Sequence, residues 1–130
     1  MERISEQQTN WEQLEQLAQG WGKLLAGEAF PGGVGLDVDF FTMEEVAVTA
    51  AKALIRGALE TMSEEQAKRL GLTVACPKCG KQCAVEQRCR AIQVRGAATP
   101  EVVEPMAHCP ACRRDFFPSA AAAEARRSSV

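Results

Sequence analysis

The sequence has no tyrosine, only one histidine, and no apolar run near the ~18 residues that a membrane-spanning helix needs. With so few candidate acid–base side chains and no clustered catalytic carboxylates, we expect no enzymatic activity and no membrane association. The first residues, MERISEQQTN, are too polar for a secretory signal, so we expect a cytoplasmic location. A net charge of −2 excludes a strongly basic, histone-like protein.

What is present is a chain whose two halves differ in charge and in cysteine. Residues 1–75 contain twelve acidic and six basic residues, a net charge of −6, and no cysteine. Residues 76–130 contain five acidic and nine basic residues, a net charge of +4, and all six cysteines. Such a change predicts two structural units. We place a helical region at 1–71, a cysteine-rich module at 72–118 and an Ala/Arg-rich flexible tail at 119–130.

The acidic half shows helical periodicity. Thr9 and Asn10 are both suitable N-cap residues, Thr9-x-x-Glu12 has the form of a capping box, and Gly27 and Pro31 are expected to end the helix that follows. Between these signals, apolar residues recur every three or four positions and form one face: Trp11, Leu14, Leu17, Ala18, Trp21, Leu24 and Leu25. The Trp11/Leu14/Trp21 face is interpreted as intramolecular core, or alternatively as the surface for a protein partner or a homodimer.

Two more helices are predicted before the cysteines. Thr42-x-x-Glu45 opens an amphipathic helix that reaches about Thr61, and Ser63-x-x-Gln66 opens a short third helix that ends at Gly71. Two amphipathic helices and a short one bury little apolar surface by themselves. We therefore expect them to pack against the cysteine-rich module or to dimerise.

The cysteine spacing predicts a metal site. Cys76-Pro-Lys-Cys79 and Cys109-Pro-Ala-Cys112 are two CxxC pairs separated by 29 residues. Two tight turns of this kind can close a tetrahedral shell of four thiolates around one Zn²⁺. A reducing cytosol favours metal over disulfides, and a closed shell makes the zinc structural. Iron–sulfur binding by the same thiolates remains open, because a sequence does not determine the metal.

Short strands are expected around the two pairs. Residues 91–95 and the stretch around 102–106 alternate in polarity, with a turn at 96–100 between them, and Arg114–Phe117 is a further candidate strand. We call each CxxC turn a knuckle. A zinc ribbon consists of a first knuckle, short strands, a second knuckle and a further strand. The predicted fold is therefore α+β, with an acidic helical unit packed on a small ribbon of antiparallel strands.

Three residues near the pairs have no assigned role. Cys83 and Cys89 are buried thiols, redox-active thiols or ligands of a second metal, of which the first is favoured because free cysteine usually behaves as a small buried hydrophobe. His108 adjoins Cys109, and adjacent residues seldom bind the same ion. It is interpreted as a flanking residue or a substitute ligand. A thiol redox switch at Cys83 or Cys89 is the weakest of the functional alternatives.

The basic residues of the second half are candidates for contacts with DNA or RNA. They are Lys81, Arg88, Arg90, Arg95, Arg113 and Arg114. Zinc with four thiolates carries a charge of −2, so these cations are equally expected to neutralise the metal site. The leading hypothesis is a non-enzymatic module that binds nucleic acid, and the alternative is a protein–protein adaptor in which zinc is purely architectural.

The segments CPKCGK at 76–81 and HCPACRRDFFP at 108–118 are similar to the zinc-ribbon region of Kra-type bacterial insertion-sequence transposases. The resemblance covers about residues 42–118 and implies a ribbon that engages DNA ends, with Cys76, Cys79, Cys109 and Cys112 as metal ligands. It implies no catalytic residue, because cleavage in that family belongs to a downstream nuclease domain. Arg113 stands where a knuckle often has glycine. The resemblance implies a transposase-related or accessory protein.

Overall fold

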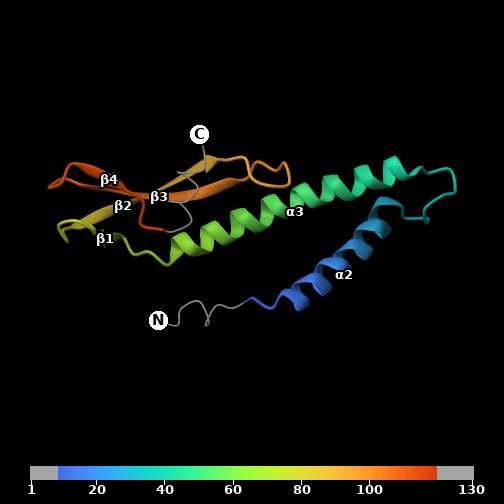
Figure 1. The fold of residues 1–130 in the computed structure, drawn as a ribbon, viewed down its shortest axis with the longest axis horizontal. Coiled ribbons are helices and arrows are strands. Elements are labelled where there is room, and N and C mark those ends of the chain that lie inside the picture. The colour runs from blue at the N-terminus through green and yellow to red at the C-terminus, as the bar shows by residue number, and fades with distance from the viewer. Residues whose placement is uncertain (1–8, 120–130) are drawn as a thin grey trace. The chain divides into compact units, whose positions relative to one another are not determined.

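The computed structural model describes residues 9–119 and confirms the α+β class (Figure 1). Two helices, α2 (Trp11–Ala29) and α3 (Phe40–Lys68), precede four strands: β1 (Thr73–Ala75), β2 (Gln82–Ala91), β3 (Glu101–Cys109) and β4 (Arg114–Phe116). The chain divides into two compact units between Ala50 and Ala51, inside α3. The second part of α3 therefore belongs to the same unit as the strands.

Helix α2 is capped by the second of its two candidate N-cap residues. Asn10, rather than Thr9, is the N-cap, because its side chain accepts a hydrogen bond of 3.1 Å from the Gln13 N–H. The helix continues through Gly27 and ends at Ala29, two residues before Pro31, which disfavours helical backbone in the residue preceding it. No residue of α2 is buried.

Helix α3 replaces the two predicted helices with one. It is capped by Asp39, whose carboxylate accepts the Thr42 N–H at 2.9 Å, so Thr42 is a residue of the first turn rather than the cap. The prediction of a separate short helix at Ser63 was wrong. Ser63 donates its hydroxyl to the Glu60 carbonyl oxygen at 3.1 Å, the backward bond of a serine inside a helix, and neither glycine nor proline interrupts residues 61–68.

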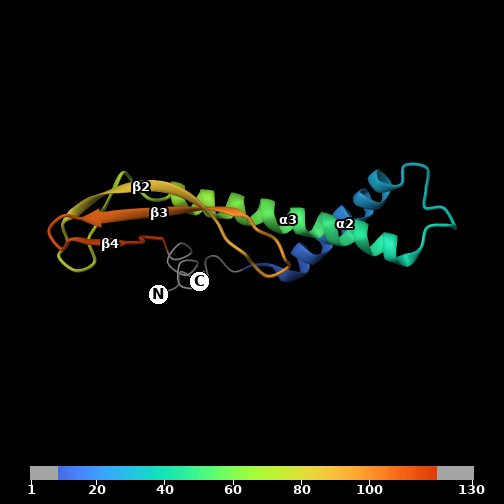
Figure 2. The ribbon, with the colours of Figure 1, turned by 90° about the horizontal axis from the view of Figure 1, so that it is seen from above.

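The four strands form an antiparallel meander in the order β1-β2-β3-β4, of which β2, β3 and β4 are labelled side by side in Figure 2. The strands predicted around 102–106 and at 114–117 are confirmed as β3 and β4. The strand predicted at 91–95 was wrong, because the strand lies earlier, at Gln82–Ala91, and residues 92–100 form the hairpin connection. Positive φ angles at Gly96 and Ala97, 86° and 60°, turn the chain back there.

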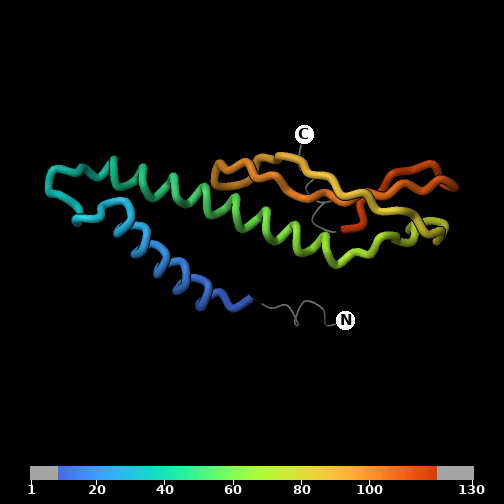
Figure 3. Tube along the Cα trace, turned by 180° about the vertical axis from the view of Figure 1, so that it is seen from behind, coloured from blue at the N-terminus to red at the C-terminus, as the bar shows by residue number. Residues whose placement is uncertain are grey.

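The second part of α3, residues 51–68, lies along the residues of β3 that β4 does not pair (Figures 1 and 3). The Glu101 N–H donates to the Glu60 carboxylate at 2.9 Å, and the Val103 N–H donates to the Ser63 hydroxyl at 3.0 Å. Backbone N–H groups of a strand alternate in direction, so the next group on this edge belongs to Pro105, which has none. The edge therefore exposes no unpaired donor over these residues.

The core of this unit is small and lies at the cysteine end. Cys76, Cys83, Ala107 and Cys109 are buried together, and Val74, Cys112 and Phe116 pack against them. At the other end, Ile55 of α3 lies against the hairpin turn, where a side chain at Gly96 would collide with it. Neither α2 nor α3 has the length and apolar character of a membrane-spanning helix, within residues 9–119.

Candidate metal centre

The first knuckle joins β1 to β2. Its turn is closed by two backbone hydrogen bonds, from the Gly80 N–H to the Cys76 carbonyl oxygen at 2.9 Å and from the Cys76 N–H to the Lys81 carbonyl oxygen at 2.8 Å. The Lys78 N–H points at the Cys76 sulfur, 3.4 Å away. Gly80 has a φ of 80°, which glycine adopts without strain.

The second knuckle, between β3 and β4, repeats this geometry with a different residue at the critical position. The Arg113 N–H donates to the Cys109 carbonyl oxygen at 2.7 Å, and the Cys112 N–H donates to the Cys109 sulfur at 3.4 Å. Arg113 has a φ of 58°, the left-handed conformation that Gly80 takes in the first knuckle. An arginine can therefore form the same turn as glycine, at an energetic cost.

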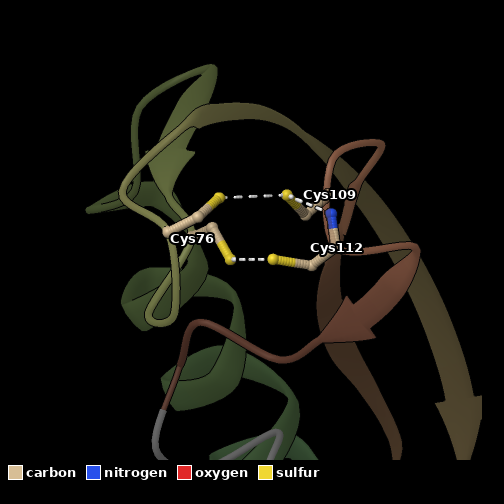
Figure 4. Close-up of side chains that lie close together, drawn as sticks. Cys76, Cys109 and Cys112 are labelled. Atoms are coloured by element: carbon tan, nitrogen blue, oxygen red, sulfur yellow. Dashed lines mark hydrogen bonds between the residues drawn. The ribbon is translucent and has the colours of Figure 1, made fainter.

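The two knuckles bring four sulfur atoms together. Cys76 and Cys112 sulfurs lie 3.9 Å apart, Cys79 and Cys109 sulfurs lie 3.6 Å apart, and all four lie within 4.8 Å of one another (Figure 4). Ligands at ~2.3 Å around a tetrahedral Zn²⁺ are separated by ~3.8 Å. All four cysteines are free, and their sulfurs are far beyond the disulfide bond length of ~2.05 Å. The four residues therefore fit one metal ion without rearrangement.

Backbone N–H groups favour the ionised, thiolate form of some of these cysteines. Hydrogen bonding from the Cys112 N–H lowers the pKa of the Cys109 thiol to about 6, and the N–H of Cys79 lowers the pKa of Cys76. The pKa of Cys112 is raised to about 12, chiefly because its thiol forms a hydrogen bond with the Cys79 sulfur and is partly buried. Without a metal, the cluster thus holds some thiolates and some thiols, and a bound cation would displace the remaining protons.

Burial differs around the cluster. Cys76 and Cys109 are buried, Cys112 is half-buried and Cys79 is exposed. Their sulfurs come from both knuckles, so a metal bound here would join chain positions that are 36 residues apart. Such a link supplements a hydrophobic core that is small for a unit of this size.

Cys83 and Cys89 lie outside the cluster. Cys83 is 3% exposed, donates to the Lys81 carbonyl oxygen at 3.2 Å and packs behind the metal ligands, and burial raises the pKa of its thiol. Cys89 is exposed on β2, six residues and ~20 Å further along the strand. A disulfide between them would require β2 to come apart.

His108 also lies outside the cluster. Its Nδ1 is 2.7 Å from a carboxylate oxygen of Asp115, directly across the β3–β4 pair. Among residues 9–119, one group of metal-binding side chains is gathered, and it contains neither His108 nor the two remaining cysteines.

The six candidate nucleic-acid residues fall into three places. Arg90 forms an ion pair of 3.0 Å with Glu104, whose side chain is 4% exposed, and Arg88 approaches the same carboxylate at 3.9 Å. Arg95 is exposed in the hairpin connection, at the far end of β2 from the knuckles. The other three, Lys81, Arg113 and Arg114, are exposed at the knuckles.

The Glu104 ion pairs were missed by sequence reasoning, although a signal for them exists. In the β2–β3 register, Arg88 is opposite Glu104, as it must be in any hairpin that turns symmetrically about Gly96. Because the strand was expected at 91–95, the pairing of Arg88 with Glu104 was not predicted. The contacts of Glu60 and Ser63 with β3 had no comparable signal, because they depend on how a helix lies against a strand edge.

No protein-family model, no curated protein and no solved structure matches this chain. The structure itself shows a zinc-ribbon-like module, in which a four-cysteine cluster is carried by short antiparallel strands.

Proposed function

We propose that Cys76, Cys79, Cys109 and Cys112 bind one structural Zn²⁺. Four thiolates are the ligand set that zinc accepts in closed tetrahedral sites, and the sulfur separations fit such a site without movement of the knuckles. A closed shell leaves no position for substrate or water. The metal therefore supports the fold rather than a reaction, and the protein is a binding module rather than an enzyme.

We further propose that the knuckle end contacts nucleic acid. Four cations surround it, Lys78 and Lys81 on the first knuckle and Arg113 and Arg114 on the second, and all are exposed. The observation that carries the proposal is that none of the four has an ion-pair partner among residues 9–119, whereas the sheet-face arginines share Glu104. The zinc thiolates offset part of this charge and leave about +2 for a phosphate backbone.

DNA is the nucleic acid that the resemblance to Kra-type transposases favours, and a transposase-related accessory role is part of the proposal. The knuckles would contact phosphates rather than read bases, since cations on turns position a protein on a duplex without specifying sequence.

The experiment is fluorescence anisotropy of a labelled mixed-sequence DNA duplex titrated with zinc-loaded protein. The test variant carries Lys81→Gln, Arg113→Gln and Arg114→Gln together. The matched control removes three exposed cations of α3 and its C-terminal end, Lys52, Lys68 and Arg69, also as glutamines. The two variants have equal net charge, so any difference between them reports location.

We expect the knuckle variant to bind at least about tenfold more weakly and to lose about 0.9 from the logarithmic salt slope for each phosphate contact removed. The control should bind like the wild type apart from a small uniform loss. Equal affinity of the two variants would refute the proposal for the knuckle end. Tighter binding of an RNA competitor of the same sequence would reassign the ligand from DNA to RNA.

The adaptor alternative is supported by a separate observation. Large apolar side chains of α2 are exposed, among them Trp11, which is 68% exposed. A protein contact would cover this surface.

A further inference from the structure

Helix α2 carries an apolar face that the structure leaves open. Its members, here called the α2 face, are 47–70% exposed: Trp11, Leu14, Leu17, Trp21 and Leu24. Surface positions tolerate single apolar residues, but two tryptophans and three leucines on one side of one helix are a contiguous patch. An isolated helix of 19 residues is also only marginally stable in water.

The face has the spacing of a helix–helix seam. Trp11, Leu14, Ala18, Trp21 and Leu25 alternate steps of three and four, which is the a/d pattern of a heptad repeat. Leu17 and Leu24 lie beside this seam and widen the apolar face beyond the a/d positions.

We propose that the α2 face pairs with α2 of a second copy of this chain, in antiparallel orientation. A two-fold axis at Ala18 pairs residues that are equally far from it, so Trp11 lies opposite Leu25, and Leu14 lies opposite Gly22, one residue from Trp21. Each tryptophan is then beside a leucine, and the small Ala18 side chains meet each other at the centre. This one small layer is flanked on each side by layers of large side chains, and the small central residue lets the two helices approach closely.

Charge selects the antiparallel arrangement over the parallel one. The next seam position after Leu25 is Glu28, and two parallel helices would place their Glu28 carboxylates directly opposite each other. In the antiparallel pair, Glu28 lies beyond the partner's apolar segment. Glu15, which flanks the seam, lies opposite Trp21 rather than another acid.

The exposed area matches a weak but specific dimer. Five large side chains, each about 60% exposed on average, present about 500 Å² per chain if a large side chain has roughly 150–250 Å². Two copies would bury about 1,000 Å², near the lower limit for specific protein interfaces. We therefore expect a dimer that dissociates at micromolar concentration.

Ionic strength distinguishes this dimer from the nucleic-acid contact. Residues 1–75 carry a net charge of −6, so two copies repel one another through these regions. Added salt screens the repulsion and should strengthen the dimer, whereas it weakens binding to DNA. The opposite responses to salt therefore allow the dimer proposal and the DNA proposal to be refuted separately.

The test is sedimentation equilibrium of the zinc-loaded full chain over a range of concentrations, at low and high salt. We expect a monomer–dimer equilibrium that shifts toward dimer with salt. Leu14→Glu should raise the dissociation constant at least tenfold, whereas the control Leu36→Glu, at a fully exposed loop residue, should not change it. A wild-type chain that stays monomeric at every concentration, or a dimer that survives Leu14→Glu, would overturn the proposal.

A second variant tests the orientation and does not depend on weakening the interface. Ala18→Cys places a thiol on the proposed two-fold axis, whereas Leu25→Cys places one at a seam position that meets its own copy only in a parallel pair. With diamide as the oxidant, Ala18→Cys should give a disulfide-linked dimer in excess of the wild type, and Leu25→Cys should not. Equal cross-linking of both variants would exclude the antiparallel register.

Discussion

Replacing Arg113 with glycine should stabilise the protein, because Arg113 holds a backbone conformation that suits glycine. The two knuckles have the same closing hydrogen bond and the same left-handed residue after the second cysteine, with φ 80° at Gly80 and 58° at Arg113. In the first knuckle a glycine takes this conformation, and in the second a residue with a Cβ is forced into it by the turn that directs Cys109 and Cys112 at the same point.

The expected magnitude follows from two opposing terms. A residue with a Cβ pays about 1–2 kcal/mol in the left-handed region, and glycine loses about 0.5–1 kcal/mol more conformational entropy on folding. At the middle of both ranges, the net gain for glycine is about 0.8 kcal/mol. For a small domain this raises the unfolding midpoint by about 2–8 °C.

The comparison must separate the effect of backbone strain from the effect of the lost charge, since Arg113→Gly also removes the guanidinium. Arg113→Ala removes the same charge but keeps the Cβ, so the difference between Arg113→Gly and Arg113→Ala reports the backbone term alone. Ala111→Gly, in the same turn but outside the left-handed region, should lower stability by about 0.5–1 kcal/mol. Thermal unfolding of the zinc-loaded proteins gives all three values.

Equal midpoints for Arg113→Gly and Arg113→Ala would refute the reasoning, since they would mean that the second knuckle bears no strain at this position. The same pair of variants also serves the nucleic-acid proposal. Both should weaken DNA binding to the same extent, because both lack the side chain that would contact phosphate.

Three further predictions concern the metal site and the contact between α3 and the strands. Zinc binding at pH 7 should release fewer than four protons, because the Cys109 thiol with its pKa of about 6 is already ionised. The number of released protons should rise toward four as the pH falls below about 6. Calorimetry in buffers of different ionisation enthalpy measures this number. Gly96→Ala should destabilise the protein by about 2 kcal/mol, because Gly96 has a positive φ and a side chain there would collide with Ile55 of α3. Gly57→Ala, which has open space around it in α3, should instead stabilise the protein by about 0.5–1 kcal/mol. Urea unfolding measures both values. Ser63→Ala should cost about 1–2 kcal/mol in the same assay, because it leaves the Val103 N–H of β3 without its acceptor, and a cost no larger than that of Glu64→Ala would contradict this role for the serine.

The metal site was predictable from sequence because its signal is local. A CxxC turn directs two sulfurs to one point by itself, and two such turns can share that point, so the gathering of the four cysteines in one cluster was correctly predicted. Strands β3 and β4 were predicted for the same reason, since each contains its own alternation.

The errors arose where the deciding interaction is distant in sequence. The third helix was predicted from a capping pattern at Ser63, but the serine hydroxyl instead serves the Val103 N–H of β3, 40 residues away. The β2 strand was placed too late because its residues are polar on the face that carries Arg88 and Arg90, and their partner Glu104 belongs to another strand. Helix α2 begins at Trp11 and takes Asn10 rather than Thr9 as its cap, a choice between adjacent candidates that capping patterns rarely resolve.

The meander order of the sheet also determines how the described part of the chain can assemble. Each strand pairs only with its neighbour in sequence, so every hairpin can close as soon as its second strand has left the ribosome, and no early segment has to wait for a distant one. The cysteine cluster is the exception, since the first knuckle is complete long before Cys112 is synthesised. An ion caught early by Cys76 and Cys79 would have only half its ligands, and its full affinity would develop after the β2–β3 hairpin had delivered the second knuckle. Metal binding would then be the last folding step of this unit, and zinc supply would control how much of the newly made chain becomes resistant to proteolysis.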